Sequence, residues 1–190
     1  MSIDDREAAR RSLVRLLQMA YSGELAASHA YQGHARSVRD PKERARITEI
    51  ENEEWVHREC VGKMLASLDA GPDSSRERWL LRIGKTIGFL CRIGGWLIPM
   101  YGAGRLESHN VKEYEDAARF ARACGREDIV DDLLHMAEVE WEHERYFRER
   151  VESRRLGRML PMWKVPPAKD EIRASYAALV RLEGPPGAAG

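Results

Sequence analysis

Four stretches of the sequence place apolar residues at alternating steps of three and four, and this spacing constrains the fold more than any other feature. The clearest stretch carries Ile47, Ile50, Val61, Met64 and Leu68. Steps of three and four return to one face of an α-helix. The sequence shows neither the apolar–polar alternation of strands nor a glycine-rich dinucleotide or phosphate motif. The pattern therefore predicts an all-α protein.

Capping and helix-breaking residues divide the chain into four long helices. Asp40 is a predicted N-cap, and Pro41 suits the first helical position, where a missing N–H costs nothing. Gly125 is a predicted helix stop. The expected helices run from Ser2–Asp5 to about Ser37, from Pro41 to Gly71 at the latest, from about Tyr101 to Cys124, and from about Glu127 to Arg155. We expect them to pack as a four-helix bundle.

The segment between the second and third helices differs from the rest of the chain. Residues 79–100 are mainly apolar but include basic residues, several glycines and Pro99, which predicts at best a broken helix. The charges and glycines argue against a membrane-spanning helix. Two alternatives stay open: a segment lying in a membrane interface or lining an entrance to the site, and a buried crossover joining two pairs of helices.

The C-terminal part is expected to be an extension of the bundle. We predict one domain over residues 1–156, with 79–100 as its crossover, and a partly irregular extension over 157–190. Within the extension, a short helix is expected from Lys169 to Leu182. The final Gly184–Gly187 stretch is expected to be a frayed tail.

The composition of the chain indicates which cellular compartment and which partners to expect. The 190 residues include 31 Lys plus Arg and 31 Asp plus Glu, so no global positive charge favours nucleic-acid binding. The 3 cysteines are far apart and form no Cys-x-x-Cys pair, which fits a reducing compartment. Residues 1–11 are charged and do not resemble a signal peptide. We expect a cytoplasmic protein, with peripheral membrane contact through 79–100 as an open alternative.

Polar side chains interrupt the apolar face of each predicted helix, in the order Glu, Glu-x-x-His, Glu, Glu-x-x-His. An unpaired buried carboxylate costs several kcal/mol, and four converging ones would repel one another. Two divalent metal ions would neutralise them, and mixed carboxylate and imidazole donors suit iron, with manganese as an alternative. The predicted metal ligands are Glu24, Glu54, His57, Glu107, Glu140 and His143.

Other acids and histidines are expected at less central positions. Glu51 and Glu138 could lie beside the metal ligands, and the remaining histidines are expected at the surface or beside the site. The acids expected to face solvent are Glu49, Glu53, Glu142 and Glu144.

From Tyr21 to Phe147 the chain resembles the ferritin-like di-iron carboxylate superfamily, and within it is most similar to the demethoxyubiquinone hydroxylases. The resemblance rests on Gly23-Glu24 followed by Tyr31, on Glu107 followed by Tyr114, and on the spacing of the ligands. It implies a ferritin-like bundle. It also implies that Tyr31 and Tyr114 lie near the open coordination side of the metals.

The same resemblance implies a role for each ligand. Glu24 and His57 would hold one iron and Glu107 and His143 the other. Glu54 and Glu140 would bridge the two ions.

The expected function is that of a di-iron oxidoreductase that uses O₂ to hydroxylate a small apolar, quinone-like substrate. Its electrons would come from an external donor, because no flavin or nicotinamide motif is present. Two alternatives stay open: a ferritin-like protein that oxidises Fe(II) for storage, and a non-enzymatic bundle that binds a membrane or a partner. A homodimer is also left open.

Overall fold

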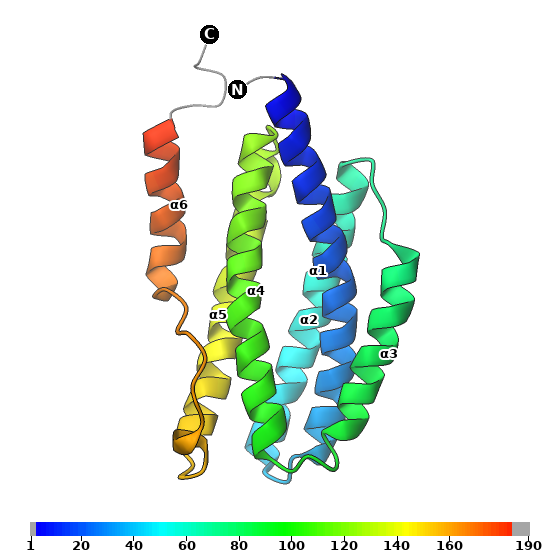
Figure 1. The fold of residues 1–190 in the computed structure, drawn as a ribbon, viewed down its shortest axis with the longest axis vertical. Coiled ribbons are helices and arrows are strands. Elements are labelled where there is room, and N and C mark those ends of the chain that lie inside the picture. The colour runs from blue at the N-terminus through cyan, green and yellow to red at the C-terminus, as the bar shows by residue number, and fades with distance from the viewer. Residues whose placement is uncertain (1–2, 184–190) are drawn as a thin grey trace. The chain divides into compact units, whose positions relative to one another are not determined.

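The computed structural model describes residues 3–183, and over this range the chain forms six α-helices, two short 3₁₀ turns and no strand (Figure 1). The all-α prediction is confirmed. The helices are α1 Ile3–Ser37, α2 Pro41–Ser67, α3 Ser74–Leu90, α4 Leu97–Ala123, α5 Val130–Glu152 and α6 Lys169–Glu183; the 3₁₀ turns are Glu127–Ile129 and Gly157–Met159. The expectations for Ser2 and for the Gly184–Gly187 tail lie outside the described residues.

The helix boundaries follow the capping residues. The Asp40 carboxylate accepts hydrogen bonds from the backbone N–H groups of Lys42 and Glu43, both at 2.9 Å, and Pro41 opens α2. These bonds satisfy donors that the first turn of a helix cannot pair internally. Gly125 follows α4 with a φ of +81°, the left-handed conformation that glycine tolerates best. Both predictions from the sequence are confirmed.

The chain divides into two compact units. Leu17–Gly102 form one, which we call the α2/α3 unit. Residues 3–16 and 103–183 form the described part of the other, which we call the α5/α6 unit.

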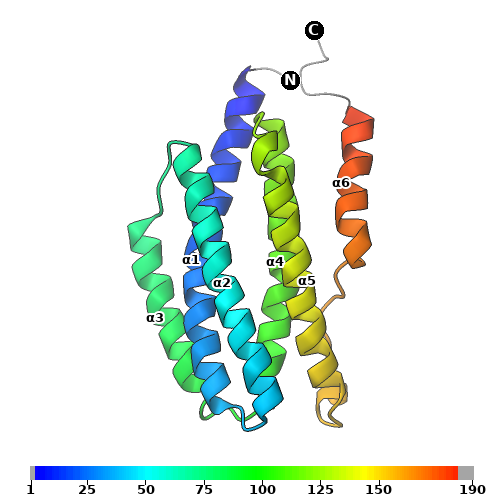
Figure 2. The ribbon, with the colours of Figure 1, turned by 180° about the vertical axis from the view of Figure 1, so that it is seen from behind.

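In the α2/α3 unit, α3 is a continuous helix that lies beside α1 in both views (Figures 1 and 2). The prediction of a broken helix over 79–100 is confirmed, because α3 ends at Leu90, α4 begins at Leu97, and the turn between them contains Gly94 and Gly95. The two earlier glycines, Gly84 and Gly88, lie within α3 and serve close packing. A Cβ atom on Gly84 would lie 2.4 Å from the Ala26 carbonyl oxygen, and one on Gly88 would lie 2.6 Å from the His29 carbonyl oxygen. Glycines spaced by one turn thus let the two backbones touch.

This packing leaves the apolar side chains of α3 facing outward. Only Gly84 and Gly88 of α3 are buried, whereas Trp79 is 62% exposed and Phe89 61% exposed. The buried-crossover alternative is therefore contradicted. Among the helices within residues 3–183, none is both long and apolar enough to cross a membrane.

Two helices have boundaries that differ from the prediction. The third long helix, α4, begins at Leu97 rather than near Tyr101, because Pro99 falls in its first turn, where no internal N–H bond is lost. The fourth long helix is preceded by the Glu127–Ile129 turn, and α5 runs only from Val130 to Glu152. The short helix predicted near the C-terminus is present as α6.

In the α5/α6 unit, α6 is held to α5 by an ion-pair cluster. The Arg173 guanidinium donates to Glu138 at 2.8 Å and also to Asp131. The two carboxylates raise the pKa of Arg173 above its usual value. Glu138, one of the two acids that could lie beside the metal ligands, pairs with Arg173 of α6.

His34 of α1 is buried, with 2% of its surface exposed, so it is not a surface histidine. Burial lowers the pKa of His34 from 6.5 to about 4. The folded chain thus keeps this imidazole neutral over a pH range in which the unfolded chain protonates it.

We expect the stability contributed by neutral His34 to be complete above pH 6.5 and to be lost as the pH falls toward 4. In that window the unfolded state binds more protons than the folded state, so stability rises with pH. Between pH 7 and 4.5 the loss should be about 2 kcal/mol. Urea unfolding at both pH values should show a smaller drop for His34→Gln than for the parent chain. His135→Gln, at an exposed position, should show the full drop.

Candidate metal centre

All six predicted metal ligands lie in the interior, so the helical phase read from the spacing is correct for each helix that carries them. Their exposed fractions range from 0% to 4%. They divide equally between the two units, and each unit holds one Glu-x-x-His pair and one further glutamate. The α2/α3 unit contains Glu24, Glu54 and His57, and the α5/α6 unit contains Glu107, Glu140 and His143.

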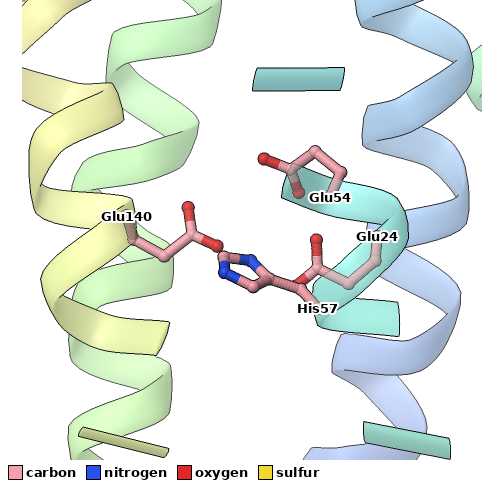
Figure 3. A group of neighbouring side chains, drawn as sticks. All are labelled: Glu24, Glu54, His57 and Glu140. Carbon is pink, nitrogen blue, oxygen red and sulfur yellow. The ribbon is translucent and has the colours of Figure 1, made fainter. Parts of the chain in front are cut away.

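In the α2/α3 unit, Glu24 comes from α1, and Glu54 and His57 come from consecutive turns of α2. Figure 3 shows the three side chains extending from these neighbouring helices toward a common region. Each offers one ligand atom, and these atoms lie within 4.8 Å of one another. Two carboxylates and one imidazole can therefore reach a single ion in this group of three, which we call the first triad.

In the α5/α6 unit, Glu107 comes from α4, and Glu140 and His143 come from α5. Their ligand atoms also lie within 4.8 Å of one another. His143 Nδ1 lies 3.6 Å from a Glu140 carboxylate oxygen. The Asn110 amide donates to a Glu107 carboxylate oxygen at 2.9 Å, which orients that carboxylate. Asn110 was not predicted, although its position one turn after Glu107 could have indicated it.

Tyr31 and Tyr114 are buried, at 3% and 1% exposed. Each follows the glutamate of its own helix by seven residues, which is a rise of about 10 Å. The Tyr31 ring stacks on His34 with centroids 6.5 Å apart. Both tyrosines thus line the apolar interior two turns from a predicted ligand, and their place near an open coordination side stays a prediction.

Arg58, directly after His57, joins three helices of the α2/α3 unit. Its guanidinium donates to the Tyr21 carbonyl on α1 and to the Glu77 carboxylate on α3, and it lies 3.6 Å from the centroid of the Tyr21 ring. These contacts fix α2 against α1 at the turn that carries His57. No sequence pattern indicates this role, because the partners come from distant parts of the chain.

Glu144 is a second difference from the sequence-based expectation. It was expected to face solvent, but only 2% of it is exposed. Its carboxylate accepts hydrogen bonds from Arg148 Nε at 2.8 Å and from the Trp163 indole at 2.6 Å. The C-terminal extension covers this side of α5, which periodicity within α5 could not reveal. Glu49 and Glu142 are exposed, as expected.

Glu113 of α4 is influenced by Glu140 of the α5/α6 unit, whose three candidate ligands Glu107, Glu140 and His143 we call the second triad. Burial raises the pKa of its carboxyl, and the charge of Glu140 raises it further. His109, whose Nε2 lies 3.3 Å from Glu113, opposes this effect. The charge of Glu140 thus also affects the ionisation of Glu113, a partly buried acid outside the triad.

The donor sets fit divalent transition metals. Each triad offers two carboxylates and one imidazole, a combination suited to iron, manganese or zinc. The buried glutamates would carry concentrated negative charge without cations. The structure therefore supports a metal site formed by buried Glu and His side chains, without specifying the metal.

No protein-family model matches the chain, and neither the curated proteins nor the solved structures provide a match.

Proposed function

We propose that the two triads together hold one dinuclear iron centre in a ferritin-like four-helix bundle, and that the protein is an O₂-dependent oxidoreductase. The observation that carries the proposal is the repeated donor set: each unit buries two carboxylates and one imidazole with ligand atoms within 4.8 Å. One glutamate from each of two helices and Glu-x-x-His from each of two others is the donor pattern of di-iron carboxylate bundles.

Charge balance supports two ions rather than one. The six side chains include four carboxylates, whose total charge matches that of two divalent cations. As the resemblance to di-iron proteins implies, Glu24 and His57 would hold one ion, Glu107 and His143 would hold the other, and Glu54 and Glu140 would be shared between them. The bridging glutamates each share a Glu-x-x-His pair with a terminal histidine, which lies one turn away on the same helix face.

Two Fe(II) ions in this centre would supply electrons for the activation of O₂. The protein side chains would hold the ions, orient their ligands and exclude water. Asn110 orients Glu107 through its amide, and Arg58 holds the turn of His57. Tyr31 and Tyr114 would form apolar walls toward the substrate side. Electrons for further turnovers would come from an external donor.

The proposed substrate is a small apolar molecule such as a quinone. The outward apolar face of α3, with Trp79 and Phe89 exposed and Arg82 and Lys85 on the same helix, suits contact with a membrane that contains such a molecule. Peripheral membrane contact is thus part of the proposal.

The proposal is tested by adding Fe(II) without oxygen, exposing the protein to O₂, and following absorbance with and without a short-chain quinone. We expect about two iron ions per chain and an early absorbance change whose decay depends on the quinone. Growth of an iron mineral without substrate would instead identify an iron-storage activity. A protein that binds no iron would be a non-enzymatic bundle, and the proposal would fail.

A further inference from the structure

The C-terminal extension contains an irregular segment, residues 160–168, which we call the strap. In Figure 1 it is the orange trace that runs back along α5 before α6 begins. Side chains from two helices hold its backbone. Ser108 of α4 donates to the Lys164 carbonyl at 2.9 Å, and the Trp141 indole of α5 donates to the Pro167 carbonyl at 2.8 Å. The strap is therefore anchored to both helices that supply the second triad.

Trp163 of the strap reaches the inward face of α4. A Cβ atom on Gly104 would lie 2.3 Å from Trp163 Cζ2 and 3.0 Å from Phe147 Cβ. Gly104 lies one turn before Glu107, and Phe147 lies one turn after His143. The indole thus occupies the volume that a side chain at position 104 would fill, in the layer next to the second triad.

The N–H group of the same indole donates a hydrogen bond to Glu144, the residue that follows the predicted ligand His143. Trp163 Nε1 donates to Glu144 at 2.6 Å, and the Arg148 guanidinium, itself bonded to Glu144, lies 4.9 Å from the indole centroid. Glu144 directly follows His143 on α5. Arg148 belongs to α5 itself, so it is the bond from Trp163 that ties the turn presenting His143 to the strap.

We propose that Trp163 is a positioning residue for the metal ion held by Glu107, Glu140 and His143. Its ring closes the layer beside this triad to water, and its N–H bond to Glu144 holds the turn of His143. Hydrogen-bond partners of metal ligands typically change metal affinity by about 10- to 100-fold. Trp163 bonds to Glu144, the neighbour of a ligand, so we expect the lower end of this range. This inference rests on the proposed metal-binding function.

The test uses Co(II), whose visible absorption reports the coordination of the ion, and two single-site backgrounds. In His57→Ala, which keeps the second triad intact, adding Trp163→Ala should weaken Co(II) binding at least about tenfold and alter the spectrum. In His143→Ala, which keeps the first triad, Trp163→Ala should leave affinity and spectrum unchanged.

Two further variants separate positioning from general loss of structure. Trp163→Phe keeps a ring over Gly104 and should recover part of the lost affinity. Trp141→Phe removes the other indole N–H that holds the strap, and it should leave the Co(II) spectrum unchanged. If Trp163→Ala does not fold, Gly104→Ala tests the same contact, because its Cβ would displace the indole, and the same weakening is expected.

The possible contrary results distinguish this inference from the proposed function. Unchanged affinity and spectrum after Trp163→Ala, or equal weakening in both backgrounds, would overturn the positioning role while leaving the metal centre in place. Absence of Co(II) binding by the unaltered chain would overturn both.

Discussion

Replacing Glu140 with alanine should abolish binding of the metal pair, which we expect to be about two ions per unaltered chain. Glu140 is fully buried within the second triad, and in the proposed centre it would contact both ions. Its loss would remove a ligand from each ion and one of the negative charges that balance them. The measurement is the metal content of purified protein after equilibration with Fe(II) in the absence of oxygen.

The matched control is Glu142→Ala on the same helix. The Glu142 side chain is 51% exposed and pairs with Lys169, so its removal should leave metal content unchanged. Equal metal content in Glu140→Ala and the parent chain would contradict the assignment.

A variant of similar shape provides a second readout at the same position. In metal-free protein, Glu140→Gln should raise the midpoint of urea unfolding, because it removes one of the buried carboxylates that would otherwise repel one another. If Glu140 instead stabilised the metal-free fold, Glu140→Gln would lower this midpoint. Lower stability of metal-free Glu140→Gln would therefore argue against accumulated negative charge in the interior.

Replacing Gly33 with alanine should destabilise the chain by about 3 kcal/mol. A Cβ atom at this position would lie 2.2 Å from the Gly88 carbonyl oxygen and 2.3 Å from Gly88 Cα. Both atoms belong to the α3 backbone, so α3 must move away from α1 and lose its packing. Urea unfolding measures the change, and limited proteolysis should show earlier cleavage in α3.

Gly23 provides the control within the same helix, because a Cβ atom there would meet nothing within 4 Å. Gly23→Ala should stabilise the protein by about 1 kcal/mol, through the higher helix propensity of alanine. If both variants were stabilised equally, the close contact between α1 and α3 would be excluded.

Sequence spacing correctly predicted that the candidate ligands on the long helices face the protein interior. Glu54, His57, Glu140 and His143 occupy the predicted inward positions because an α-helix repeats every 3.6 residues wherever it forms. The helix boundaries at Asp40 and Gly125 were also predicted correctly, because capping depends on residues close in the sequence. The residues of each triad could therefore be named from helical periodicity alone.

The C-terminal region shows where this reasoning stops. Trp163 lies in an irregular segment without periodicity, so its contact with Gly104 and its bond to Glu144 could not be derived from spacing. For the same reason Glu144 was wrongly assigned to a solvent-facing side. Its burial depends on a residue 19 positions further along the chain.

The glycines of α3 also depend on partners that are distant in the chain. The predicted break in segment 79–100 is present at residues 91–96. Considered without their neighbours in space, Gly84 and Gly88 would also be expected to weaken the helix. Packed against α1, they allow a close backbone contact that only residues without a side chain can make. The sequence by itself determined the helices, their inward faces and the candidate metal ligands, because these depend on neighbours within a few turns. Only the tertiary structure decided the place of α3, the burial of Glu144 and the position of Trp163, because each depends on a partner distant in the chain.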